Sequence, residues 1–287
     1  MSQLTTLTTL ASLKAELRQL RQQGHTLALV PTMGNLHTGH LRLVEEAKRH
    51  ADKVIATIFV NPLQFGPDED FASYPRTLAD DQAQLASVGC DVLFAPSADE
   101  IYPHGQQQLT KVCVPQVSEG LCSAKRPGHF DGVATVVTKL FNMVQPDIAC
   151  FGQKDYQQLA VIRKLTEDLN FPVQIIGVPT CRSAEGLALS SRNAYLTEKE
   201  LERAPKLYAT LQATALKLQE GKLNYHELTH QARAKLAELG FSPEYVEIRA
   251  LDLSPALAST QEWVILAAAR IGKARLIDNL IVKKHQA

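Results

Sequence analysis

Short, almost continuously apolar runs recur along the first two thirds of the chain, and glycine, proline or polar residues follow each of them. Runs of this kind are typical of strands that are buried on both faces of a parallel sheet. Between the runs, apolar residues recur at helical spacing, beginning with Leu10, Leu13, Leu17 and Leu20 ahead of Gly24. The strands predicted in this way cover residues 27–30, 54–60, 91–95, 147–151 and 173–178.

Strands that alternate with helices predict right-handed βαβ units, because a parallel pair of strands needs a crossover connection. Helical patterns lie between the predicted strands at residues 76–88, in a segment that reaches about Val144, and from Tyr156 to Ile162. We therefore predict an α/β fold with a doubly wound parallel sheet. Ligands of such a sheet bind beyond the carboxyl ends of its strands.

The pattern changes beyond Pro179, which indicates a second, smaller α+β domain. Thr197 and Glu200 have the spacing of a capping box that opens a long helix, and residues 223–239 predict another helix, ended by Gly240. Three strands are predicted at residues 245–248, 263–270 and 274–278, the last two joined by a turn at Gly272. We expect one domain of residues 1–180 and another of residues 181–287.

Charge and composition limit the functions open to the 287-residue chain. Its 30 basic and 30 acidic residues give a formal net charge of zero, so no global field attracts it to nucleic acid or to an anionic membrane. A hydrophobic content of 45% is ordinary for a globular enzyme and too high for a disordered chain. Any anion-binding site must therefore be local.

The cysteines and the N-terminus favour a cytoplasmic protein. Five cysteines are scattered without a Cys-x-x-Cys pair, which suggests neither a disulfide framework nor a zinc site, and we expect reduced, mostly buried thiols. The first residues lack the basic and then apolar order of a signal peptide. No apolar run is long enough to span a bilayer.

A strand, a tight turn and a helix start follow one another at residues 27–47. We expect this turn to offer unpaired backbone N–H groups and the positive end of a helix dipole to a phosphate or carboxylate. Gly34 and Gly39 would let the backbone approach a ligand closely. His37 and His40 lie three residues apart and would donate to the same anion. The alternative is a surface turn with two solvated histidines.

Polar residues follow two other predicted strands in the same way. Gln64 comes just after the strand of residues 54–60, next to the histidine turn. After the strand of residues 147–151, Lys154 supplies a movable charge suited to phosphate, and Asp155 accepts well from ribose hydroxyls. Gln158 lies one helical turn beyond Lys154 and faces the same side.

The run PTMGNLHTGH of residues 31–40 resembles the nucleotide-binding signature of the pantoate–beta-alanine ligases, a family in a wider superfamily whose Rossmann-like domains bind ATP through a His-x-Gly-His motif. The runs FVNPLQFG at residues 59–66 and FGQKDYQQ at residues 151–158 are similar to further segments of that family. Residues 185–193 are identified as its second ATP loop. The chain departs from the expected pattern at Ser123, Cys181 and Leu189, where the family suggests glycine, valine and methionine.

The resemblance implies three groups of site residues. Pantoate would be bound by Gln64 and Gln158, and beta-alanine by Gln64. The catalytic residues would be His37, His40, Lys154 and Arg192. ATP would contact Met33, Gly34, Asn35, Leu36, His37, Thr38, Gly39, His40, Gly152, Gln153, Lys154, Asp155, Cys181, Leu189, Ser190, Ser191 and Arg192.

The resemblance also implies features beyond these contacts. Mg²⁺ would accompany the ATP phosphates, with no set of protein metal ligands assigned. The chain would form a homodimer through its N-terminal domain, and its C-terminal domain would form a lid over the site. Asp80 and Asp81 would either lie on a solvated helix face or act near the ligand or its magnesium ion. Apart from the resemblance, Arg126 and His129 fit helix entry and packing.

These features predict an ATP-dependent ligase that adenylates a carboxylate and passes the acyl group to an amine. By resemblance it condenses (R)-pantoate with beta-alanine through a pantoyl adenylate, giving pantothenate, AMP and pyrophosphate for coenzyme A biosynthesis. A nucleotidylyltransferase with a phosphate-bearing acceptor is an alternative, but the acceptor region has glutamines where Arg or Lys would be needed. A nucleotide-binding regulator without chemistry is another, and the set of histidines, lysine and arginine disfavours it.

Overall fold

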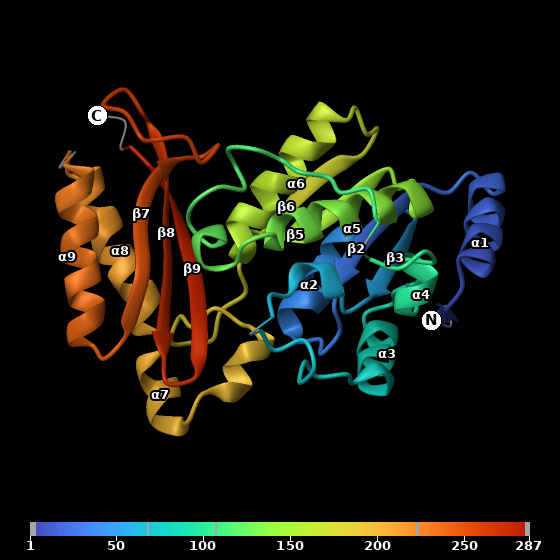
Figure 1. Cartoon of the computed structure of the whole chain (residues 1–287), viewed down its shortest axis with the longest axis horizontal. Helices are drawn as coiled ribbons and strands as arrows, with labels where there is room; N and C mark the ends of the chain where they lie inside the picture. The colour runs from blue at the N-terminus through green and yellow to red at the C-terminus, as the bar shows by residue number, and fades with distance from the viewer. Residues whose placement is uncertain (1–3, 68, 107, 222–223, 285–287) are drawn as a thin grey trace. The chain divides into compact units, whose positions relative to one another are not determined.

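The computed structural model describes residues 4–67, 69–106, 108–221 and 224–284 (Figure 1). Contacts between Cα atoms divide the chain into two compact units. The first comprises Met1–Gln153 and Val161–Pro179, and the second Lys154–Ala160 and Thr180–Ala287. Among the described residues, no helix combines the length and the apolar character that crossing a bilayer requires.

The first unit contains a six-stranded sheet in the order β1-β4-β3-β2-β5-β6, with every neighbouring pair parallel. The prediction of a doubly wound parallel sheet is therefore confirmed. β2 lies between β3 and β5, so its carboxyl end is the point where the strand order reverses. The strands are β1 (Thr5–Leu7), β2 (Leu27–Thr32), β3 (Lys53–Ile58), β4 (Val92–Phe94), β5 (Ile148–Gly152) and β6 (Gln174–Val178).

The helices of this part of the chain are α1 (Leu10–Gln22), α2 (Thr38–Ala47), α3 (Leu78–Ser87), the short α4 (Ala98–Ile101), α5 (His129–Val144) and α6 (Tyr156–Asp168), with 3-10 turns η1 (Pro62–Gln64), η2 (Ser123–Lys125) and η3 (Gln153–Asp155). The helices predicted here are present, although α6 extends beyond its predicted end at Ile162 and the short α4 was not predicted. The sequence did not predict β1, because its three residues are half-exposed or exposed and lack an apolar run.

The second unit has an antiparallel sheet of β7 (Ser242–Ala250), β8 (Glu262–Ile271) and β9 (Ala274–Lys283). Helices α8 (Lys206–Gln219) and α9 (Tyr225–Glu238) lie together on one face of this sheet (Figure 1). A continuous apolar core joins the two layers, with Leu211 and Leu236 from the helices and Trp263 and Ile265 from β8. The predicted α+β character is therefore confirmed.

The long helix predicted from Thr197 is wrong in its length. The capping box of Thr197 and Glu200 is present, but α7 (Glu198–Arg203) ends after six residues, and α8 begins separately at Lys206. Pro205 lies between them and has no backbone N–H to continue the helical hydrogen bonds. The prediction that a helix begins at residue 223 falls outside the described residues, and α9 is described from Tyr225.

Gly132 of α5 allows this helix to lie directly against η1. An ideal Cβ at Gly132 would lie 2.4 Å from the carbonyl oxygen of Leu63 and 2.7 Å from the backbone nitrogen of Gln64. Both contacts are with backbone, which cannot rotate away as a long side chain can. A glycine at this position therefore fixes the distance between α5 and the segment that carries Gln64.

We expect Gly132→Ala to destabilise the protein, although alanine normally favours a helix. The added methyl must push η1 away from α5, and overpacking of this kind typically costs about 1–3 kcal/mol. That loss corresponds to a fall in Tm of roughly 2–10 °C in a protein of this size, which thermal unfolding measures. The control is Gly152→Ala, whose Cβ would meet nothing within 4 Å. An unchanged Tm for Gly132→Ala would contradict this packing.

Candidate functional site

The turn between β2 and α2 is held by a buried carboxylate from α3. Asp81 is 1% exposed, and its oxygens accept hydrogen bonds from Asn35 N at 3.0 Å and from Leu36 N at 2.7 Å. Gly34 has φ +84°, and an ideal Cβ there would lie 3.1 Å from both Asp81 Oδ2 and a methyl carbon of Ile58. Only glycine combines this conformation with so close an approach.

The expectation that this turn offers unpaired N–H groups is wrong for four of its residues, whose backbone N–H groups donate to side chains. Asn35 and Leu36 donate to Asp81. At the start of α2, Gly39 N donates to His37 Nδ1 at 3.0 Å, and His37 N donates to His40 Nδ1 at 3.2 Å. The two histidines therefore form a reciprocal capping box that satisfies backbone donors at the helix end.

This capping box determines which ring nitrogens can donate to a ligand. Because Nδ1 of each ring accepts a backbone N–H, the neutral rings of His37 and His40 carry their proton on Nε2. The ring centroids lie 4.1 Å apart with an interplanar angle of 43°. The site can therefore offer two neighbouring Nε2–H donors at the N-terminus of a helix, beyond the carboxyl end of β2.

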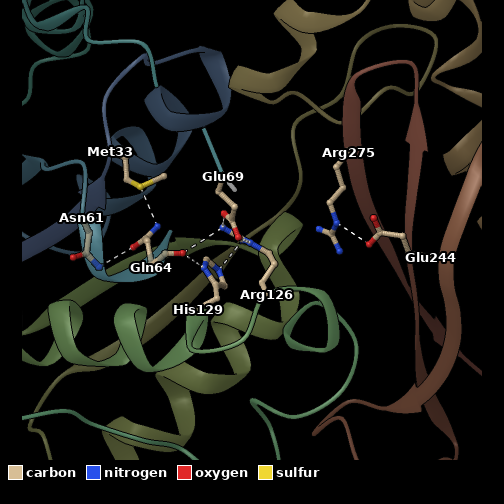
Figure 2. A network of polar contacts seen from close by, with 8 residues as sticks. All are labelled: Met33, Asn61, Gln64, Glu69, Arg126, His129, Glu244 and Arg275. Carbon is tan, nitrogen blue, oxygen red and sulfur yellow. Dashed lines mark hydrogen bonds and ion pairs between the residues drawn. The ribbon is translucent and has the colours of Figure 1, made fainter. Parts of the chain in front are cut away.

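Gln64 is oriented by a chain of buried hydrogen bonds (Figure 2). Asn61 Nδ2 donates to Gln64 Oε1 and to Gly132 O, each at 3.1 Å, and the Tyr102 hydroxyl donates to Asn61 Oδ1 at 2.8 Å. The Gln64 amide nitrogen lies 3.0 Å from Met33 Sδ, so the glutamine contacts the histidine turn. The first unit thus brings Gln64 and Met33 together, as the sequence placed them.

Arg126 and His129 hold the backbone of Gln64 in place (Figure 2). His129 Nδ1–H donates to Gln64 O at 2.8 Å, and Arg126 Nη1 donates to His129 Nε2 at 3.0 Å. Arg126 also forms an ion pair with Glu69 through two nitrogens. Burial alone would raise the pKa of the Glu69 carboxyl, but the hydrogen bonds and charge of Arg126 hold that pKa below its usual range. These contacts agree with the expected roles in packing.

The remaining predicted residues lie after β5 and in the loop before α7. Gln153 donates to Gly177 O at 3.2 Å within the first unit. Lys154 and Asp155 follow in the second unit, with Lys154 Nζ 3.7 Å from Asp155 Oδ2. In the loop, the Ser190 hydroxyl accepts from Arg192 N at 3.3 Å and caps η4 (Ser191–Tyr195).

The predicted residues therefore divide between the two units. The first unit carries Met33, Gly34, Asn35, Leu36, His37, Thr38, Gly39, His40, Gln64, Gly152 and Gln153, and the second carries Lys154, Asp155, Gln158, Cys181, Leu189, Ser190, Ser191 and Arg192. The burial of Asp81 contradicts the prediction that it lies on a solvated helix face. Sequence reasoning missed the supporting roles of Asp81 and Tyr102. Both act on residues more than 40 positions away, so no local pattern could reveal them.

Cys90 and Cys150, two buried cysteines of the first unit, are poor nucleophiles. Burial raises the pKa of the Cys90 and Cys150 thiols to about 12, so both are protonated near neutral pH. No disulfide joins any of the five cysteines, and Cys90, Cys122 and Cys150 are buried, as expected, whereas Cys113 is exposed and Cys181 half-buried. Within the described ranges, no group of three or more His, Cys, Asp or Glu side chains is arranged to hold a metal ion.

Comparisons with known proteins give one consistent result. The sequence model of a family described as "Pantoate-beta-alanine ligase" matches residues 5–281. A "Pantothenate synthetase" of Ectopseudomonas mendocina is 57% identical over 281 residues, covering 98% of this chain and 99% of that protein. A protein of the same name from Chromohalobacter salexigens is 58% identical over 278 residues, with coverage of 96% and 98%.

Solved structures agree with the sequence relatives. The pantothenate synthetase of Thermus thermophilus superposes with a TM-score of 0.89 at 45% identity, covering 96% of this chain and 98% of that one. The pantoate-beta-alanine ligase of Francisella tularensis, whose structure is described as complexed with beta-gamma ATP and beta-alanine, gives 0.80 at 36% identity and covers 97% of each chain.

We expect Asp81→Asn to loosen the turn before α2, because an amide has only one acceptor oxygen for the two N–H donors. An unpaired buried N–H costs about 1–3 kcal/mol, so hydrogen exchange at the Asn35 amide or at the Leu36 amide should speed up about tenfold or more. Asp80→Asn is the matched control, since Asp80 is exposed on the same helix. Equal exchange in the two variants at both Asn35 and Leu36 would show that Asp81 does not hold the turn.

Proposed function

We propose a two-step reaction for this chain, which belongs to the pantoate-beta-alanine ligase family and condenses pantoate with beta-alanine using ATP. In the first step, a carboxylate oxygen of pantoate attacks the α-phosphorus of ATP, and pyrophosphate leaves. In the second, the amine of beta-alanine attacks the acyl carbon of the pantoyl adenylate and loses a proton, and AMP leaves. The adenylate supplies a better leaving group than the oxygen of a free carboxylate.

The capping geometry of His37 and His40, which puts the proton of each neutral ring on Nε2, is the observation that carries this proposal. Their rings lie at a helix N-terminus beyond the point where the strand order reverses, a position that favours phosphate. Charge on the phosphates grows as the α-phosphorus is attacked, and donors that are already oriented stabilise it at little reorganisation cost. We assign the rest of the nucleotide contact on this unit to residues 33–39.

We assign the other nucleotide contacts to residues of the second unit. Lys154, Ser190, Ser191 and Arg192 supply cationic and hydroxyl donors suited to phosphate, and Asp155 suits the ribose hydroxyls. Gly152 and Gln153 lead into this segment, while Cys181 and Leu189 would make backbone or apolar contacts. The related Francisella tularensis ligase, described as complexed with beta-gamma ATP, supports ATP as the nucleotide.

Gln64 and Gln158 are assigned to pantoate, and Gln64 also to beta-alanine. A primary amide both donates and accepts, which suits a ligand that has hydroxyls and a carboxylate. Support for Gln64 comes from the network through Asn61 and Tyr102, which fixes the direction of its amide without adding charge. A phosphate-bearing acceptor would favour Arg or Lys here, so the ligase is favoured over a nucleotidylyltransferase.

We also make proposals about the metal ion, the oligomeric state, the role of the C-terminal residues and the location of the protein. Among the described residues, no group of three or more His, Cys, Asp or Glu side chains could hold a metal ion, so Mg²⁺ would be brought by the ATP phosphate oxygens. We also propose a homodimer formed through the first unit, a lid role for residues 181–287, and a cytoplasmic location.

Release of pyrophosphate distinguishes the proposed reaction from its alternatives. With ATP and pantoate alone, we expect a single burst of pyrophosphate, because the adenylate stays bound. Addition of beta-alanine should start continuous release, matched by AMP and pantothenate. A nucleotidylyltransferase would need a phosphate-bearing acceptor instead, and a regulator would release nothing.

We expect His40→Ala to lower turnover much more than ATP affinity. A donor aimed at the reacting phosphates acts mainly on the transition state, and loss of one such donor typically costs about 10²–10³ in rate. His50→Ala is the control, because His50 lies just beyond α2 and pairs with Glu46 on the surface. Turnover of His40→Ala equal to that of the control would remove His40 from the reaction.

We expect Gln64→Ala and Gln158→Ala to impair the use of pantoate. Each truncation removes hydrogen bonds worth about 1–3 kcal/mol, so kcat/KM for pantoate should fall about tenfold or more. ATP affinity measured without pantoate should stay near that of the unaltered protein. Gln106→Ala, at an exposed position, is the control. A loss of ATP binding equal to the loss of pantoate use would reassign these glutamines to the nucleotide.

A further inference from the structure

The loop that carries Arg192 begins as a small hairpin of the second unit. Arg182 and Ala188 form an antiparallel bridge across it, and Leu189 N donates to Cys181 O at 2.9 Å. The chain then enters η4, which carries Arg192. The position of Arg192 therefore depends on what holds the hairpin.

Arg182 anchors the hairpin to β9 through a bidentate ion pair with Asp278. Its Nη1 lies 2.7 Å from Oδ2, and its Nη2 lies 2.8 Å from Oδ1. The Asp278 side chain is 3% exposed and the Arg182 side chain 17% exposed, and the guanidinium carbon lies 3.4 Å from the centroid of the Tyr208 ring. Removing one partner of such a pair leaves a buried charge uncompensated. The charge of Arg182 is thus engaged in holding the loop.

The next residue of β9 holds the other cationic segment of this unit. Asn279 Nδ2 donates to the carbonyl oxygen of Lys154 at 2.9 Å. Asn279 is 7% exposed, and its own backbone N donates to Asp278 Oδ1 at 2.8 Å. Successive side chains of a strand point to opposite faces, so two neighbouring residues can reach two different segments. β9 pairs with β8 in an uninterrupted antiparallel register. In this register, Asp278 lies opposite Ala267 and Asn279 lies opposite Leu266.

We propose that Asp278 and Asn279 are positioning residues for ATP. They attach the turn of Lys154 and the loop of Arg192 to one strand, so that the two cations are presented to the nucleotide phosphates in a fixed relation. Charges that are already held in place stabilise an anion more than mobile charges do, because binding then costs little conformational entropy. The inference rests on the proposed function, in which Lys154 and Arg192 contact ATP.

The test compares ATP and pantoate kinetics in Asn279→Ala, Asp278→Asn and Asp278→Glu. Asp278→Asn leaves the buried charge of Arg182 without its partner, so Asn279→Ala, which removes one neutral hydrogen bond, carries the test if that variant fails to fold. Glu262→Gln is the matched control, because Glu262 belongs to the same pair of strands and forms an exposed ion pair with Lys283 of β9. Each variant is also characterised by Tm and by hydrogen exchange at residues 153–156 and 182–193.

We expect Asn279→Ala to raise the KM for ATP about tenfold, the equivalent of one lost buried hydrogen bond, and the KM for pantoate by less than about threefold. Asp278→Asn should raise the KM for ATP more, and Asp278→Glu should recover part of the loss because it keeps the charge. Exchange should speed up in residues 153–156 for the Asn279 variant and in residues 182–193 for the Asp278 variant. Glu262→Gln should match the unaltered protein in all of these.

A merely structural role predicts a different result. Asn279→Ala would then lower Tm and the fraction of active molecules, while the KM for ATP stayed unchanged, and this outcome would overturn the inference. Lys154→Ala and Arg192→Ala show whether the proposed function itself fails, since they should weaken ATP binding directly. If these two variants bind ATP normally, the assignment of the nucleotide contacts is wrong. If they weaken ATP binding and Asn279→Ala does not, only the positioning role is wrong.

Discussion

The carboxylate of Asp81 and the absence of a side chain at Gly34 together determine the backbone conformation of the turn that follows β2. Asp81 accepts the N–H groups of Asn35 and Leu36, and Gly34 lets the backbone come within contact of that carboxylate. His37, which follows Leu36, then caps the N-terminus of α2, and its ring accepts a hydrogen bond from Gly39 N. The direction of both histidine rings, and therefore the chemistry at this edge of the sheet, depends on a turn that a residue of another helix holds.

Buried charges near the proposed site are used to hold backbone segments. Asp81 holds the turn before α2, Arg126 with Glu69 supports the segment of Gln64, and Arg182 with Asp278 holds the loop of Arg192. Asp81 accepts hydrogen bonds from backbone N–H groups, and each of the other two is an ion pair within one unit. The chain as a whole has a formal charge of zero, so attraction of a nucleotide must come from a few local donors and not from a general field. The structure thus separates charges that build the site from groups proposed to contact the ligand.

Much of the fold could be predicted, because it depends on patterns within one segment. The apolar runs gave β2 to β6, and the capping box at Thr197 gave the start of α7. The failures have local reasons as well: β1 is a short edge strand without an apolar run, and Pro205 divides a helix that looked continuous.

The candidate site was predictable only in part. His37, His40 and Gln64 could be found because they follow predicted strands, whereas the pairing of the turn N–H groups could not. Their partners are side chains whose approach depends on the tertiary fold: Asp81 lies 45 positions from Leu36, and Tyr102 lies 41 positions from Asn61. Sequence patterns identify groups proposed to contact a ligand more readily than the groups that orient them.

The central claim is that the capping box makes His37 and His40 present Nε2–H to the ligand. Nitrogen NMR of the protein labelled with ¹⁵N in its histidine rings reads the tautomer of each ring directly. Near neutral pH, we predict the proton on Nε2 for His37 and His40, and on Nδ1 for His129, which donates to Gln64 O and provides an internal reference. A proton on Nδ1 of either His37 or His40 would contradict this claim.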